Sequence, residues 1–206
     1  MNLGLLGEGS SDRALLPVLR WLLAETTPKP LELRFVDPVL LPGRARTLAE
    51  KVERAALLGP WDLLFIHRDA DAQPPEWRLS EIANAAGRQP HVAVVPVRMT
   101  EAWLLVSETA IRAAAGRPSG AEPLSLPRLK GIETLADPKV TLRDALTKAH
   151  AAAGRRARRF DPDAAVHRVA ELVEDWSPLR ILPAFGALEA DLRKALARLG
   201  VAVTVG

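Results

Sequence analysis

The sequence predicts an α/β fold in which helices flank a mainly parallel central sheet, with a mostly helical C-terminal part. Strand-like and helix-like segments alternate through residues 1–100, which is typical of a parallel layered domain. The run WDLLFIH is nearly all apolar, as a strand buried on both faces should be. After residue 100 the pattern becomes mainly helical. We therefore expect an α/β core over residues 1–100 and a helical region over residues 101–206 that packs on it.

The first half of the chain supplies the expected sheet. Short apolar or alternating runs predict strands at NLGLLG, LELRFV, WDLLFIH and HVAVVPV. Amphipathic segments between them predict helices over residues 11–24 and 43–58, and a third helix that ends near Ala86. Pro17 falls inside the first helix, where it kinks the helix or marks its true first turn.

The second half is expected to be helical around one long loop. TEAWLLVSETAIRAAAG predicts a helix that ends at Gly116, and the Pro/Gly-rich RPSGAEPLSLPRLKG predicts a loop. Further helices are expected over residues 141–153, 161–175 and 185–199. The C-terminal VAVTV is expected to form a small edge strand.

Composition excludes several classes of function. The 206 residues are 48% apolar and 26% charged, which is ordinary for a globular protein. The absence of cysteine excludes disulfides, zinc–thiolate sites and iron–sulfur clusters, and the absence of tyrosine excludes a tyrosyl nucleophile. The first residues lack the basic segment of a signal peptide, and no stretch approaches the roughly 18 apolar residues of a membrane span. We expect a cytoplasmic protein without a membrane partner.

Acidic residues follow three of the expected strands. Glu8 lies in the turn GEGSSD, Asp69 and Asp71 lie in HRDADA, and Glu101 begins the segment after the fourth strand. Parallel strands end at one edge of the sheet, and residues two apart in an extended segment face the same way. Carboxylates that meet there repel one another unless a cation neutralises them. Oxygen ligands without cysteine favour Mg²⁺ or Mn²⁺, and such a site is typical of phosphoryl transfer.

These motifs resemble the Toprim family, which includes topoisomerases, primases and the overcoming-lysogenization-defect nucleases. The Toprim pattern is E-G after the first strand and D-x-D after a later one, here GEGSSD and DAD. The remainder is similar to a bacterial Toprim-like family known as a domain of unknown function. That family carries E-x-W-L-L (Glu101 to Leu105), a P-K element (Pro138 and Lys139) and a C-terminal S-P…F-x-x-L segment, here WSPLRILPAFGAL. The resemblance covers nearly the whole chain.

The resemblance implies a role for each acidic residue. Glu8 would act as general acid or base, and Asp69 and Asp71 would hold magnesium. In the nuclease branch a further acidic residue supports a second metal and a lysine stabilises the pentavalent phosphate, which are the roles implied for Glu101 and Lys139. A chain without tyrosine is not a usual topoisomerase, and one without a zinc finger or further primase region is not a standard primase. Metal-dependent hydrolysis of nucleic acid is the activity that remains, with phage defence beside a partner ATPase expected by analogy.

A basic segment is the candidate nucleic-acid contact. GRRARRF supplies Arg155, Arg156, Arg158 and Arg159, and residues 128–160 hold nine Lys or Arg against three Asp or Glu. Such a segment binds a phosphate backbone, or it is a solvated helix end whose cations offset the helix dipole. The low aromatic content, 4%, disfavours binding of single strands by base stacking.

Other interpretations stay open at this stage. The chain is also consistent with a non-catalytic Toprim-shaped adaptor that binds nucleic acid or a protein. GEGSSD nearly matches the dinucleotide-binding G-x-G-x-x-G, but Glu8 would face the pyrophosphate and Asp12 replaces the third glycine. A D-x-D also occurs in haloacid-dehalogenase-like phosphatases, although there it follows the first strand. His67 is either a contact to metal or substrate or a structural strand-end residue, and Trp103 is expected in the core.

Overall fold

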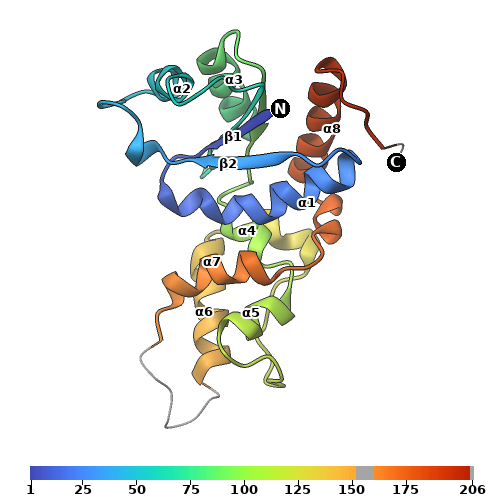
Figure 1. Ribbon diagram of the computed structural model, residues 1–206. Coiled ribbons are helices and arrows are strands. Elements are labelled where there is room, and N and C mark those ends of the chain that lie inside the picture. The colour runs from blue at the N-terminus through green and yellow to red at the C-terminus, as the bar shows by residue number, and fades with distance from the viewer. Residues whose placement is uncertain (152–159, 205–206) are drawn as a thin grey trace.

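The computed structural model describes residues 1–151 and 160–204 (Figure 1). Its centre is a four-stranded sheet with the strand order β2-β1-β3-β4, in which every pair is parallel. The strands are β1 (Asn2–Leu6), β2 (Glu32–Val36), β3 (Leu63–His67) and β4 (His91–Val94). Leu6 pairs with Ile66, and His67 pairs with Val94, so the strands end together at one edge. The expected α/β class with a parallel central sheet is confirmed.

Helices cover both faces of this sheet. The first half of the chain forms η1 (Ser10–Leu15), α1 (Leu16–Thr26), η2 (Pro38–Leu40), α2 (Leu48–Ala56) and α3 (Pro75–Ala86). Side chains alternate along β1, so Leu5 packs in the α1 core and Leu6 in the core under α2 and α3. Figure 1 shows α2 and α3 on one side of the sheet and α1 on the other. Pro17 stands in the first turn of α1, so it marks the start of the helix and does not kink it.

The C-terminal half is helical and joins the α1 side of the core. Its elements are α4 (Glu101–Leu104), α5 (Glu108–Ala114), η3 (Leu129–Thr134), α6 (Pro138–Ala151), α7 (Pro162–Leu172), η4 (Ser177–Ile181) and α8 (Pro183–Arg198). Trp103 is buried and meets Phe185 of α8 edge-to-face, with ring centroids 5.4 Å apart, which confirms its expected core position. Helix α8 also packs on β4 and α1.

Two expected elements are wrong. The helix expected from Thr100 to Gly116 is interrupted, because the Ser107 hydroxyl accepts the N–H of Ala110 at 3.2 Å and starts a new helix, α5. The expected edge strand is absent from the described residues 201–204. There the N–H of Thr204 donates to the Thr26 carbonyl at 2.8 Å, so this segment binds the end of α1 instead of a sheet edge.

Within the ranges that the structure describes, no helix combines the length and the apolar character needed to cross a bilayer.

Candidate metal centre

The turn after β1 is built around Asp12. One carboxylate oxygen of Asp12, Oδ2, accepts the N–H of Glu8 at 2.6 Å and that of Gly9 at 3.1 Å. A Cβ atom at Gly7 would lie 2.9 Å from both Cβ and Oδ2 of Asp12, so only glycine lets this carboxylate fold back under the chain. The aspartate thereby holds the backbone of Glu8 at the carboxyl end of the sheet.

The Glu8 side chain reaches the segment that follows β3. Its Oε2 atom accepts the N–H of Asp69 at 3.1 Å, and its Oε1 atom lies 2.9 Å from Nε of Arg68. The carboxylate is 33% exposed. β1 and β3 are parallel neighbours, so the expectation that Glu8 and Asp69 meet at one sheet edge is confirmed.

His67 is the last residue of β3 and its side chain is 0% exposed. Its Nδ1 atom lies 3.0 Å from the Val94 carbonyl oxygen, which only accepts hydrogen bonds, so Nδ1 carries a proton. In the neutral ring the lone pair therefore stands on Nε2, which lies 3.4 Å from Oδ1 of Asp69 and 3.8 Å from Oδ2 of Asp12. A ring nitrogen held by a backbone carbonyl while the other faces carboxylates is the arrangement of metal-binding histidines.

The Asp69 carboxyl is partly buried among other acidic side chains, which disfavours its ionised form. Burial, as the largest cause, and the negative charges of Glu8, Asp12, Glu101 and Asp71 together raise the pKa of its carboxyl to about 8. The Thr100 hydroxyl donates to Oδ1 of Asp69 at 3.3 Å. A divalent cation at this position would neutralise the carboxylates that now disfavour one another.

Glu8, His67 and Asp69 together form what we call the metal triad. Each offers one ligand atom, and these atoms all lie within 4.8 Å of one another. The donor set is two carboxylate oxygens and one imidazole nitrogen, in a partly buried place that already favours positive charge. The triad can hold a metal ion.

Asp71 is not part of the metal triad. The chain leaves the strand conformation after His67, and Asp71 occupies a turn with a left-handed φ of 54°. Its carboxylate is 58% exposed and lies 3.1 Å from Nη2 of Arg78. Residues 69–71 are therefore not extended, and the two aspartates do not share a direction as an extended D-x-D would.

Glu101 and Lys139 stand on the wall of a cavity beside the triad. Glu101 is the first residue of α4, and its Oε1 atom lies 4.0 Å from Nζ of Lys139 at the start of α6. The cavity has a volume of 430 Å³. It is lined by Ser11, Asp12, Ala14, Asp69, Met99, Thr100, Glu101, Lys139, Arg143, Asp163, Val166 and His167. The structure thus brings Asp69, Glu101 and Lys139 to one cavity.

The four arginines expected to contact nucleic acid, Arg155, Arg156, Arg158 and Arg159, lie outside the described residues. Two other residues of the site were not singled out by sequence reasoning. Asp12 follows Gly9 by three positions, which is the spacing at which an acidic side chain accepts backbone N–H groups at a helix start. The role of Asp12 could therefore have been predicted from the sequence. No comparable signal marks Thr100, whose position depends on the turn between β4 and α4.

No family model, curated protein or solved structure matches the chain. We therefore infer the function from the parallel sheet, the metal triad and the cavity beside it.

Proposed function

We propose that the protein is a Toprim-like, metal-dependent phosphodiester hydrolase that cuts nucleic acid. One observation carries the proposal: Glu8, His67 and Asp69 meet at the carboxyl edge of a parallel sheet, and Asp69 lines a cavity that also contains a lysine. Ligands of open parallel sheets bind at this edge. A cation held by acidic groups, together with a nearby positive side chain, suits a phosphodiester substrate. The cation and the side chain can both neutralise the negative charge of the phosphate.

The cation that suits the triad is Mg²⁺ or Mn²⁺. Carboxylate oxygens favour both ions, whereas the imidazole nitrogen of His67 favours Mn²⁺ over the harder Mg²⁺. When bound, the cation supplies Lewis-acid polarisation of a phosphoryl oxygen. The hydrogen bond from Nδ1 of His67 to Val94 holds the ring so that Nε2 keeps its direction.

Lys139 and Glu101 are the residues proposed to handle the substrate in the cavity. At 4.0 Å the pair between them is loose, and the Lys139 side chain is 48% exposed. Its ammonium group can therefore turn from Glu101 to the phosphate, where it stabilises negative charge that develops during cleavage. Glu101 faces the same space and adds to the negative charge near Asp69. This position suits a second cation site, the role that the Toprim resemblance implies.

A second candidate function is a non-catalytic adaptor that binds nucleic acid or a protein. It is favoured by the ion pairs Glu8–Arg68, at 2.9 Å, and Asp71–Arg78, at 3.1 Å. In the first pair an arginine of this chain neutralises a carboxylate of the metal triad, and in the second it neutralises a carboxylate to which the Toprim resemblance assigns metal binding. A chain that supplies its own cations can keep the Toprim shape without binding metal.

Metal-dependent cleavage distinguishes the two functions. Wild-type protein is incubated with labelled single-stranded DNA, duplex DNA and RNA in Mn²⁺, in Mg²⁺ and in EDTA. We expect cleavage that requires the metal and is lost in Asp69→Asn. Asp144→Asn removes the same charge from an exposed position of α6 outside the cavity lining, and it should cleave as the wild type does. If no substrate is cut and calorimetry detects no Mn²⁺ binding, the adaptor is the correct function.

The Toprim resemblance extends the proposal to phage defence beside a partner ATPase. Purification of the tagged protein from its native cell tests this extension separately, since an associated ATPase is expected only if the defence role holds.

A further inference from the structure

A second cavity adjoins the one beside the metal triad. It has a volume of 460 Å³ and is lined by Ser10, Arg13, Ala14, Leu16, Pro17, Arg20, His167 and Glu171. Ala14 and His167 line both cavities, so the two spaces meet at these side chains. Together they form a groove, which we call the η1–α7 groove after the elements on its two sides.

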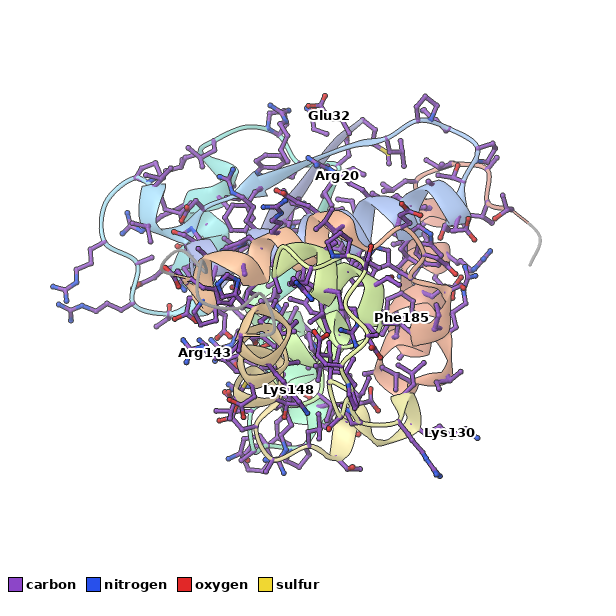
Figure 2. The ribbon with its side chains drawn as sticks, turned by 90° about the horizontal axis from the view of Figure 1, so that it is seen from below. Arg20, Glu32, Lys130, Arg143, Lys148 and Phe185 are labelled. Carbon is purple, nitrogen blue, oxygen red and sulfur yellow. The ribbon has the colours of Figure 1, made fainter. Side chains whose placement is uncertain are left out.

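The periodicity of these elements explains which side chains line each of the two cavities. In the 3₁₀ helix η1, with three residues per turn, Ser10 and Arg13 face the second cavity while Ser11 faces the first. Along α7 the lining residues are Asp163, His167 and Glu171, four apart and therefore on one stripe of the helix. Helix α7 packs against η1. Figure 2 shows Arg20 and Arg143, which line different cavities, on opposite sides of α7 in that view.

The second cavity is positively charged where the first is negative. Arg13 and Arg20 line it against one carboxylate, that of Glu171. The Arg13 guanidinium lies 5.4 Å from the centre of the Phe35 ring, and Nη2 of Arg20 donates to the Leu33 carbonyl at 3.1 Å. Among the residues that the structure describes, neither arginine forms an ion pair with a carboxylate. Both guanidinium groups are thus held in place without being neutralised.

We propose that the η1–α7 groove binds the backbone of a single-stranded polynucleotide, with phosphates at Arg13 and Arg20 next to the phosphate at the metal triad. This inference rests on the proposed function and extends it from phosphodiesters in general to a polymer that spans both cavities. A cation-binding site followed by fixed arginines matches a chain with one negative charge per nucleotide. Cavities of 430 and 460 Å³ have the size of small-ligand sites, which suits one strand better than a duplex.

Salt-dependent binding tests the groove. Fluorescence anisotropy measures the affinity of the protein for oligo-dT, for oligo-U and for a duplex of the same length, in EDTA to prevent cleavage. The double variant Arg13→Gln/Arg20→Gln should bind both single strands more weakly. The slope of log K against log salt should become less steep by about 1.4, since each phosphate contact to a single strand contributes about 0.7. Arg13→Lys/Arg20→Lys retains the charge and should retain the slope.

The matched control is Lys29→Gln/Arg88→Gln. These two exposed cations precede β2 and β4, at the opposite edge of the sheet, and their loss should leave the slope unchanged. The groove is contradicted if the control weakens binding as much as the arginine variant does, or if duplex binds as tightly as the single strands. Melting temperatures of all variants show whether they fold. If the glutamine variant is unfolded, the salt slope of the lysine variant tests the proposal instead. A groove that binds phosphates requires this slope to stay at the wild-type value.

The same samples separate this proposal from the proposed function. Mn²⁺-dependent hydrolysis of bis(p-nitrophenyl) phosphate, a small diester that does not span the groove, reports on the metal triad alone. If the wild type hydrolyses it and the glutamine variant keeps the wild-type salt slope, the groove proposal fails and the hydrolase remains. If the wild type does not hydrolyse it, the hydrolase fails, and with it the polymer proposal.

Discussion

The Nε2 atom of His67 lies 3.4 Å from Oδ1 of Asp69, while Nδ1 of the same ring is bound to the carbonyl of Val94. The hydrogen bond to the Val94 carbonyl fixes the ring so that Nε2 faces the Asp69 carboxyl group. A lone pair and a carboxylate at this distance repel each other unless a proton or a metal ion lies between them. Burial and the neighbouring carboxylates also raise the pKa of Asp69, and the consequences for stability and for metal binding follow from these relationships.

The first prediction concerns the stability of the metal-free protein. The pKa of Asp69 rises from 3.8 to about 8 on folding, so between these values the folded state binds more protons than the unfolded state. The contribution of Asp69 to the free energy of unfolding is therefore fully present below pH 3.8 and is lost as the pH rises toward 8. Thermal unfolding in EDTA should show this decrease, and Asp69→Asn should show less of it. An equal pH dependence in both proteins would contradict the assignment.

The second prediction distinguishes two roles of Glu8. As a member of the metal triad, Glu8 contributes one ligand atom, so Glu8→Gln should weaken Mn²⁺ binding by at least about tenfold as well as abolish cleavage. A residue that only transfers protons, the role implied by the Toprim resemblance, would lose cleavage and retain metal binding. Isothermal titration with Mn²⁺ measures the difference. Glu53→Gln, an exposed change on α2, serves as the control.

The third prediction concerns Lys139. Because its ammonium group faces the cavity and pairs only loosely with Glu101, Lys139→Gln should lower the cleavage rate by about a hundredfold. Mn²⁺ affinity should stay at the wild-type value, since Lys139 is no metal ligand. Lys148→Gln, on the same helix but outside the cavity lining, should leave the rate unchanged. Equal losses in the two variants would mean that only the general charge of α6 matters.

The fourth prediction tests the turn that presents Glu8. Asp12→Ala leaves the N–H groups of Glu8 and Gly9 without their acceptor, which should lower the free energy of unfolding by about 1–3 kcal/mol. Asp12→Asn keeps one acceptor oxygen and should lose less. Urea unfolding in EDTA measures the free energy of unfolding of both variants. The pH is kept below the pKa of Asp69, because the Asp69 carboxyl is then uncharged and the charge of Asp12 does not act on it. A loss in Asp12→Asn as large as that in Asp12→Ala would show that the hydrogen bonds are not the cause.

The sheet and the meeting of Glu8 with Asp69 could be predicted from the sequence. Strands such as Leu63–His67 are short apolar runs between turn residues, and parallel strands end at one edge whatever their details. Periodicity also located α7 and α8 to within a few residues. These features depend on local pattern and on general rules of topology.

The rest depended on tertiary contacts that no local pattern encodes. The sequence spacing of Asp69 and Asp71 suggests a shared direction, but Asp71 lies in a turn with a left-handed φ and its carboxylate pairs with Arg78. The sequence leaves open whether His67 contacts a metal or is structural, and only the hydrogen bond of Nδ1 to the Val94 carbonyl shows that Nε2 faces Asp69. The groove likewise requires α7 to lie against η1, although more than 140 residues separate them in the chain.

The most direct test of the account is the anomalous diffraction of a crystal soaked in Mn²⁺. We expect a peak bonded to one oxygen each of Glu8 and Asp69 and to Nε2 of His67, at a position that is vacant after soaking in EDTA. A peak at Asp71 instead, or no peak on the protein at saturating Mn²⁺, would contradict the metal triad and the hydrolase that depends on it.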